Sequence, residues 1–135
     1  MLILSVSHDP ELLESRSAIL RAAGYAVLPA TSTKHAIDYF QPGHFDLVLL
    51  DHSIPTQDKD RLIRLLRASD GHVLIVLVSA QPHTAPDPLA DATIESTPLK
   101  LLNGIKDADA NRAMISRATK SFAPPNSTEA APTGI

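Results

Sequence analysis

Two apolar runs constrain the fold of this 135-residue chain more than any other feature. Residues 45–50 read FDLVLL and residues 73–78 read VLIVLV, with too little alternation for a sheet that is exposed to water on one face. Both runs are typical of central strands in a parallel sheet. Between them an apolar stripe at helical spacing predicts a helix over about 58–68, formed by Leu62, Ile63, Leu65 and Leu66.

The same alternation of strand and helix extends along most of the chain. Short apolar segments predict further strands at 2–6, 25–28 and 92–96. Helices are expected after each of them, because parallel strands need a crossover connection that returns the chain to the same end of the sheet. The expected helices cover 10–24, about 32–40, and a last segment that begins after Pro98.

The helix boundaries follow from residues with known terminal preferences. Asp9 suits the N-cap of the first helix, Pro10 its first position and Gly24 its C-cap. Asn103-Gly104 weakens the last helix, which either breaks there or continues to about Lys120. We therefore expect one domain over 1–121, followed by a disordered tail over 122–135 that is rich in Pro, Ala, Ser and Thr.

Composition excludes several classes of function. The chain has 12 Lys and Arg against 15 Asp and Glu, which gives a formal net charge of -3. A chain with this balance lacks the excess of basic residues that binding to a nucleic-acid backbone requires. Cysteine is absent, which excludes disulfides, thiolate catalysis and cysteine-based zinc sites. The longest apolar run is too short to cross a bilayer. A soluble protein of the cytoplasm is the expectation, with no contact to nucleic acid or membrane.

In an open parallel sheet the functional residues lie at the carboxyl ends of the strands. The residues found there in this sequence carry hydroxyl, imidazole and carboxylate groups. They are Ser7, His8, Asp9, Asp51, Ser53, Ser79, Thr97 and Pro98.

At this level the sequence resembles the receiver domain of two-component response regulators. The most specific segment is FDLVLLDHSIP at 45–55, supported by DPELL at 9–13, AAGY at 22–25 and the Ser79-Ala80 pair. The resemblance implies a flavodoxin-like sheet of five parallel strands in the order 2-1-3-4-5. The stretch from Ser79 to Thr97 is short and proline-rich, which implies that the fourth helix is shortened or missing.

The resemblance also implies roles for single residues. Asp51 takes the position of the phosphoacceptor, which receives a phosphoryl group from a histidine kinase with the help of a divalent cation. Ser79 takes the position of the hydroxyl that follows the phosphoryl group, and the backbone carbonyl of Ser53 would face the cation. Thr97-Pro98 takes the position of the family's Lys-Pro pair.

The same comparison shows what the pocket lacks. Ser7 and His8 stand where the family has two acidic residues, and Thr97 stands where it has a lysine. Phosphoryl transfer depends on cations that neutralise the transferred group, and Mg²⁺ needs several oxygen ligands. Only Asp51, the Ser53 carbonyl and Asp9 remain as metal candidates, and Asp9 is better used as a helix cap. No cofactor is therefore expected, except that Mg²⁺ would be needed if Asp51 is phosphorylated.

His8 offers one way to compensate for the lost charge. A protonated imidazole beside Asp51 would pair with its carboxylate and create a contact that depends on pH. A transition-metal site formed by His8, His52 and Asp51 is a weaker alternative, because His52 should point away from its neighbour on the strand.

Three hypotheses on function remain open. The first is a non-enzymatic, degenerate receiver that signals by binding protein partners, without ordinary Mg²⁺-dependent phosphorylation. The second is a working receiver that a histidine kinase phosphorylates on Asp51. The third, a small flavodoxin-like enzyme or nucleotide binder, lacks the glycine-rich loop that it would need after the first strand. The partner would be a histidine kinase or a downstream regulator, and the sequence predicts no oligomeric state.

Overall fold

The computed structural model describes the backbone of residues 1–80 and 87–122, and the side chains of this part up to residue 111. It divides into two compact units, residues 1–105 and 106–135. Residues 123–135 of the expected disordered tail lie outside the described part, and the domain boundary at 121 stays a prediction.

The first unit contains one parallel sheet of five strands in the order β2-β1-β3-β4-β5. This confirms the fold class that the sequence predicts. The strands are β1 (Leu2–Val6), β2 (Ala26–Ala30), β3 (Leu47–Asp51), β4 (Leu74–Ser79) and β5 (Ala92–Glu95). The helices are α1 (Pro10–Ala22), α2 (Thr33–Tyr39), α3 (Thr56–Ser69) and α4 (Pro98–Phe122).

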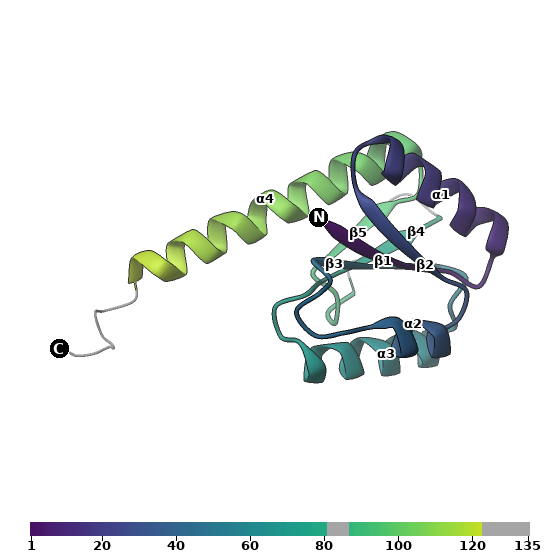
Figure 1. Ribbon diagram of the computed structural model, residues 1–135, viewed down its shortest axis with the longest axis horizontal. Helices are drawn as coiled ribbons and strands as arrows, with labels where there is room; N and C mark the ends of the chain where they lie inside the picture. The colour runs from purple at the N-terminus through teal and green to yellow at the C-terminus, as the bar shows by residue number, and fades with distance from the viewer. Residues whose placement is uncertain (81–86, 123–135) are drawn as a thin grey trace. The chain divides into compact units, whose positions relative to one another are not determined.

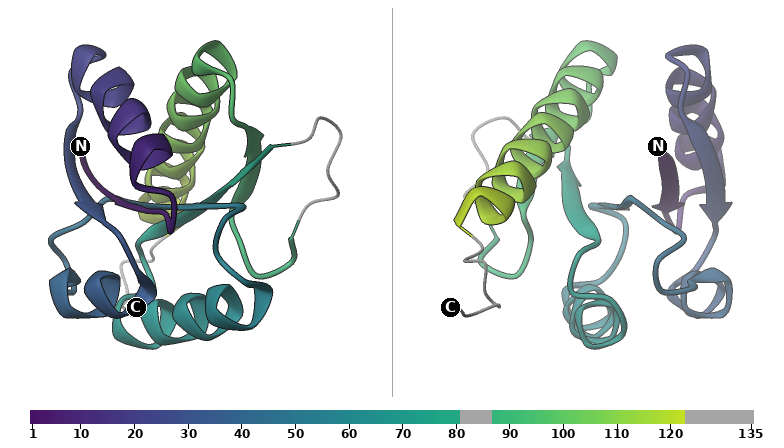
Figure 2. Two further views of the ribbon diagram at one scale, coloured as in Figure 1. Left: turned by 90° about the vertical axis from the view of Figure 1, so that its right-hand side faces the viewer. Right: turned by 60° about the vertical axis from the view of Figure 1, so that its left-hand side comes forward.

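Helices cover both faces of the sheet (Figure 1). α2 and α3 lie on one face, while α1 and the first residues of α4 lie on the other (Figure 2). The first helix begins as predicted, because the Asp9 carboxylate accepts hydrogen bonds from the backbone N–H groups of Glu11 and Leu12. α3 begins at Thr56, two residues before the expected start at Asp58, since Pro55 fixes an extended backbone that the helix follows directly.

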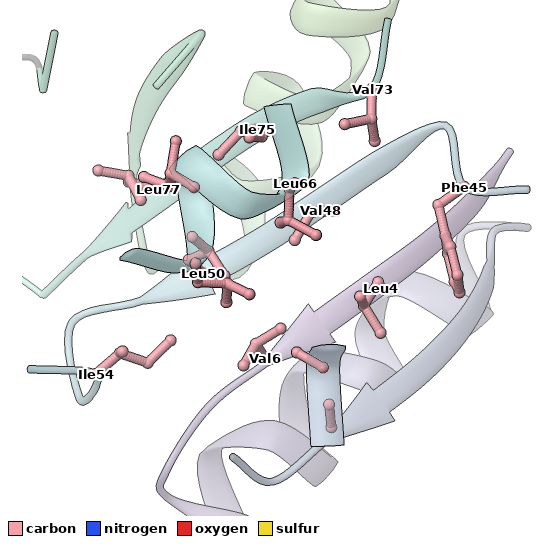
Figure 3. Packing of buried hydrophobic residues seen from close by; sticks show 14 residues of the cluster. Leu4, Val6, Phe45, Val48, Leu50, Ile54, Leu66, Val73, Ile75 and Leu77 are labelled. Atoms are coloured by element: carbon pink, nitrogen blue, oxygen red, sulfur yellow. The ribbon is translucent and has the colours of Figure 1, made fainter. Parts of the chain in front are cut away.

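The face under α2 and α3 holds a cluster of buried apolar side chains (Figure 3). Alternate residues of the central strands contribute to it, together with one face of α3. Its members include Leu4, Val6, Val48, Leu50, Ile75, Leu77, Leu62, Ile63 and Leu66. The remaining strand residues therefore face α1 and α4, and Asp51 is among them because it follows Leu50 directly.

The connection from β4 to β5 contains no helix over its described residues, 87–91. The described chain accordingly has four helices, as expected for a shortened or missing fourth helix. α3 holds this connection through two ion pairs, Lys59–Asp87 and Arg67–Asp91, each with an N to O distance of 2.6 Å. Between them Leu89 packs against the apolar cluster. The segment therefore covers part of the sheet without helical structure.

α4 continues through Asn103-Gly104 instead of ending there. A Cβ atom added at Gly104 would overlap the side chain of Ile94 in β5. The glycine is thus required by the close approach of the helix to the strand, and its low helix propensity is the cost of that approach. Within the residues that the structure describes, no helix combines the length and hydrophobicity needed to cross a membrane.

We predict that Gly104→Ala destabilises the protein, although alanine is the better helix former. The added methyl group overpacks the contact with Ile94, which typically costs about 1–3 kcal/mol, and the gain in helix propensity of up to about 1 kcal/mol offsets only part of it. Urea unfolding measures the change. Gly71→Ala is the matched control, because a Cβ atom there meets no other atom within 4 Å. A Gly104→Ala protein as stable as the control would contradict the packing argument.

Candidate functional site

The carboxyl end of β3 carries a buried carboxylate. All five residues of β3 are buried, and Asp51 is its last residue. The side chain of Asp51 is 0% exposed, although a carboxylate is among the groups that are most costly to remove from water. Asp51 therefore needs partners inside the protein.

Arg16 of α1 supplies the opposite charge. Its Nη1 atom lies 2.9 Å from Oδ2 of Asp51, and its side chain is only 3% exposed. The arginine is buried because it lies on the face of α1 that packs against the sheet, together with Leu13, Ser17 and Leu20. The other terminal nitrogen, Nη2, is also buried and has no hydrogen-bond partner among the described residues.

The second oxygen of the carboxylate is held by the loop that follows β3. Oδ1 of Asp51 accepts hydrogen bonds from the backbone N–H of Ser53 at 3.0 Å and from its hydroxyl at 2.5 Å. The same hydroxyl lies 3.3 Å from Oγ of Ser7 and accepts the backbone N–H of His8 at 2.8 Å. Hydrogen bonds thus join the loop after β1 to the loop after β3.

These partners decide the charge state of Asp51. Burial alone would raise the pKa of its carboxyl, but the hydroxyls of Ser53 and Ser7 and the guanidinium of Arg16 outweigh that effect and hold the pKa below its ordinary value. Asp51 is therefore an anion at neutral pH. Arg16 carries the matching positive charge, so the pair is electrically balanced.

The predicted residues at the end of β1 serve this network in different ways. Ser7 is buried and also accepts the backbone N–H of Asp9. Asp9 caps α1, the use that the sequence favours over metal binding. His8 is exposed, and the hydrogen bond that it gives to the network comes from its backbone. The structure thus pairs Asp51 with Arg16, where the sequence suggests His8.

The remaining predicted residues lie at the ends of neighbouring strands. Ser79 ends β4, one residue beyond Val78, which pairs with Asp51 across the sheet. Its backbone carbonyl accepts the N–H of Ser96. Thr97 and Pro98 are exposed at the start of α4, where the carbonyl of Thr97 accepts the N–H of Leu101. The fold therefore brings Ser79 next to the strand of Asp51, while Thr97 and Pro98 serve the helix start.

The donor set around Asp51 does not fit the divalent cation that the resemblance implies. A cation would need several oxygen ligands, yet Oδ2 of Asp51 faces a guanidinium and the positions of the acidic pair hold Ser7 and His8. Over the side chains that the structure describes, no group of three His, Cys, Asp or Glu residues could hold a metal ion.

Sequence reasoning alone missed Arg16. A signal was nevertheless present, because Arg16 and Ser17 lie three and four residues after Leu13, and Leu20 follows after seven. Positions at this spacing form one face of a helix, so a core face bounded by two leucines must bury the arginine and requires an acidic partner.

Comparisons with known proteins agree with this fold. The family model described as the response regulator receiver domain matches residues 3–92. Among curated proteins no match is found. A CheY-like receiver domain protein from Methanospirillum hungatei is 24% identical, with a TM-score of 0.71 over 84% of this chain and 96% of that chain. The response regulator TrrA from Thermotoga maritima, solved with Mg²⁺ and BeF, is 25% identical, with a TM-score of 0.69 over 79% and 97%. TrrA has also been solved in complex with the histidine kinase ThkA.

We predict that Arg16 and Asp51 are strongly coupled in stability. Arg16→Met leaves a buried carboxylate without its cation, and Asp51→Asn leaves the cation without its carboxylate. Each is expected to cost about 3–5 kcal/mol, while the double variant costs less than the sum by about 1–3 kcal/mol. Urea unfolding of the four proteins at neutral pH measures this coupling.

The coupling should also depend on pH in a defined direction. The pKa of Asp51 in the folded protein lies below its ordinary value, which is about 3.9 in an unfolded chain. The stabilisation that the ionised Asp51 contributes is therefore complete above about pH 4, the pKa of its carboxyl in the unfolded chain. It is lost as the pH falls through the lower pKa that Asp51 has in the folded protein. Lys100→Met is the control for removal of a positive charge, because the ion pair of Lys100 with Glu95 is exposed and its loss should change stability little.

If the effects of Arg16→Met and Asp51→Asn on the free energy of unfolding were additive, the assignment of a coupled ion pair would be contradicted.

Proposed function

Because the chain belongs to the response regulator receiver domain family, we propose that it is a receiver that signals by protein binding without Mg²⁺-dependent phosphorylation of Asp51. In this proposal the domain is not an enzyme, binds no cofactor, and works in the cytoplasm. Its partner is a signalling protein, either a histidine kinase or a downstream regulator.

The ion pair between Arg16 and Asp51 is the observation that carries this proposal. Phosphorylation would require an oxygen of Asp51 to attack phosphorus in line with the leaving group. Oδ2 is bonded to Arg16, Oδ1 is bonded twice to Ser53, and the side chain is 0% exposed. An incoming phosphoryl donor would have to break these contacts before it could reach the nucleophile.

Charge balance supports the same conclusion. A phosphoryl group brings additional negative charge, and its transfer is catalysed by cations placed around its oxygens. The positive charge next to Asp51 is already engaged by the carboxylate, and the lysine position of the family holds the exposed Thr97. Nothing in the described pocket is then left to neutralise the transferred group.

Phosphorylation of Asp51 by a histidine kinase is the second candidate. It is favoured by the presence of Asp51 at the end of β3 and of Ser79 at the end of the neighbouring strand β4. The similarity to TrrA, which has been solved with a histidine kinase, also supports a kinase as partner. In this case Arg16 would have to release the carboxylate and contact the phosphoryl oxygens instead.

Phosphorylation by a small acyl phosphate separates the two candidates. The protein is incubated with acetyl phosphate and Mg²⁺, and its intact mass is recorded by mass spectrometry. TrrA from Thermotoga maritima is the positive control and Asp51→Asn the negative control. We expect an adduct on TrrA and none on this protein. An adduct that forms on the wild type and is lost in Asp51→Asn would refute the first candidate and would show that Asp51 accepts a phosphoryl group, as the second candidate requires.

A further inference from the structure

We propose that Arg16 is the residue that makes this pocket independent of divalent cations, and that the lost acidic pair alone does not. The inference rests on the proposed function and names the device that regulates the same site. In place of a metal ion that binds and leaves, the chain supplies a permanent cation from the buried face of α1. A receiver with this device has no step at which Mg²⁺ could switch it.

The first argument is the fixed position of the guanidinium. Arg16 lies in the interior of α1, between Leu13 and Leu20, which are 3% and 0% exposed. The helix itself is anchored at its start by the Asp9 cap. The 2.9 Å contact with Asp51 is therefore held by a packed element of the fold, unlike an ion pair between two long side chains on the surface.

The second argument is electrostatic. A divalent cation is attracted to a pocket by its net negative charge and by free oxygen ligands. Asp51 and Arg16 carry opposite charges at a buried contact, so together they offer no net charge. A guanidinium keeps its proton at any ordinary pH, so the carboxylate of Asp51 keeps its counter-ion and offers a metal ion no uncompensated charge.

The third argument concerns Nη2 of Arg16. This atom is a buried donor without a hydrogen-bond partner among the described residues, and leaving such a donor unpaired is costly. Ser7 already contacts Ser53, which in turn binds Asp51. A carboxylate introduced at position 7 would therefore join the hydrogen-bond network that holds Asp51, and, among the described residues, the guanidinium that binds Asp51 has a donor to spare. We expect the guanidinium to bind the new carboxylate, as a bidentate or bridging partner, before a metal ion can.

The test restores the acidic pair with and without Arg16. One variant carries Ser7→Asp and His8→Asp, and a second carries the same two changes together with Arg16→Met. Amide NMR spectra are recorded during titration with MgCl₂ alone. The first variant keeps the pair of Arg16 and Asp51. In the second variant, a bound Mg²⁺ can compensate the charge of the carboxylates. A dispersed amide spectrum shows for each variant that the protein is folded.

The expected result is that Mg²⁺ binds more tightly when Arg16 is removed. Saturable shifts at Asp51 and Ser53 should appear in the variant with Arg16→Met, while the two-acid variant binds Mg²⁺ at least about tenfold more weakly. Equal affinity of the two variants would overturn the inference, as would an absence of binding in both. These outcomes are separate from the proposed function, because that proposal fails only if the wild type is itself phosphorylated on Asp51.

Discussion

The contact between Arg16 and Asp51 is the constraint on which the rest of the pocket depends. A carboxylate at the end of the central strand β3 cannot be buried without compensation. The arginine can reach it only because α1 packs with Leu13, Arg16, Ser17 and Leu20 toward the sheet. Strand order, helix register and the cap at Asp9 therefore all contribute to the geometry of one ion pair.

The other oxygen of the same carboxylate belongs to the network that links the two loops at the carboxyl end of the sheet. Ser53 binds Oδ1 of Asp51 with its N–H and its hydroxyl, and the same hydroxyl contacts Ser7 and the N–H of His8. Since Oδ2 binds Arg16, both oxygens of the carboxylate have hydrogen-bond partners inside the protein. A pocket of this kind stabilises a single arrangement of its loops, which suits a domain that presents a constant surface to a partner.

The fold could be predicted from the sequence because it depends on the spacing of apolar residues and on the order of strands and helices along the chain. Continuous apolar runs predict the central strands, and apolar stripes at helical spacing predict the crossover helices between them. Asp51 could be predicted because it follows such a run at the functional edge of the sheet. Arg16 could not be recognised from charge alone, since an arginine on a helix is usually solvated. Only the spacing from Leu13 to Leu20 identifies its position as buried. The role of Gly104 is likewise tertiary, because it depends on the contact with Ile94.

The most direct test of the central claim is the titration of the Asp51 carboxyl carbon by ¹³C NMR, with and without Mg²⁺. We predict a pKa below the ordinary value of about 3.9 and no response to Mg²⁺, because Arg16 already provides the positive charge. An Asp51 carboxyl whose pKa lies at or above that value, and whose resonance shifts when Mg²⁺ is added, would show that the carboxylate is free to bind a metal ion. That result would contradict the account.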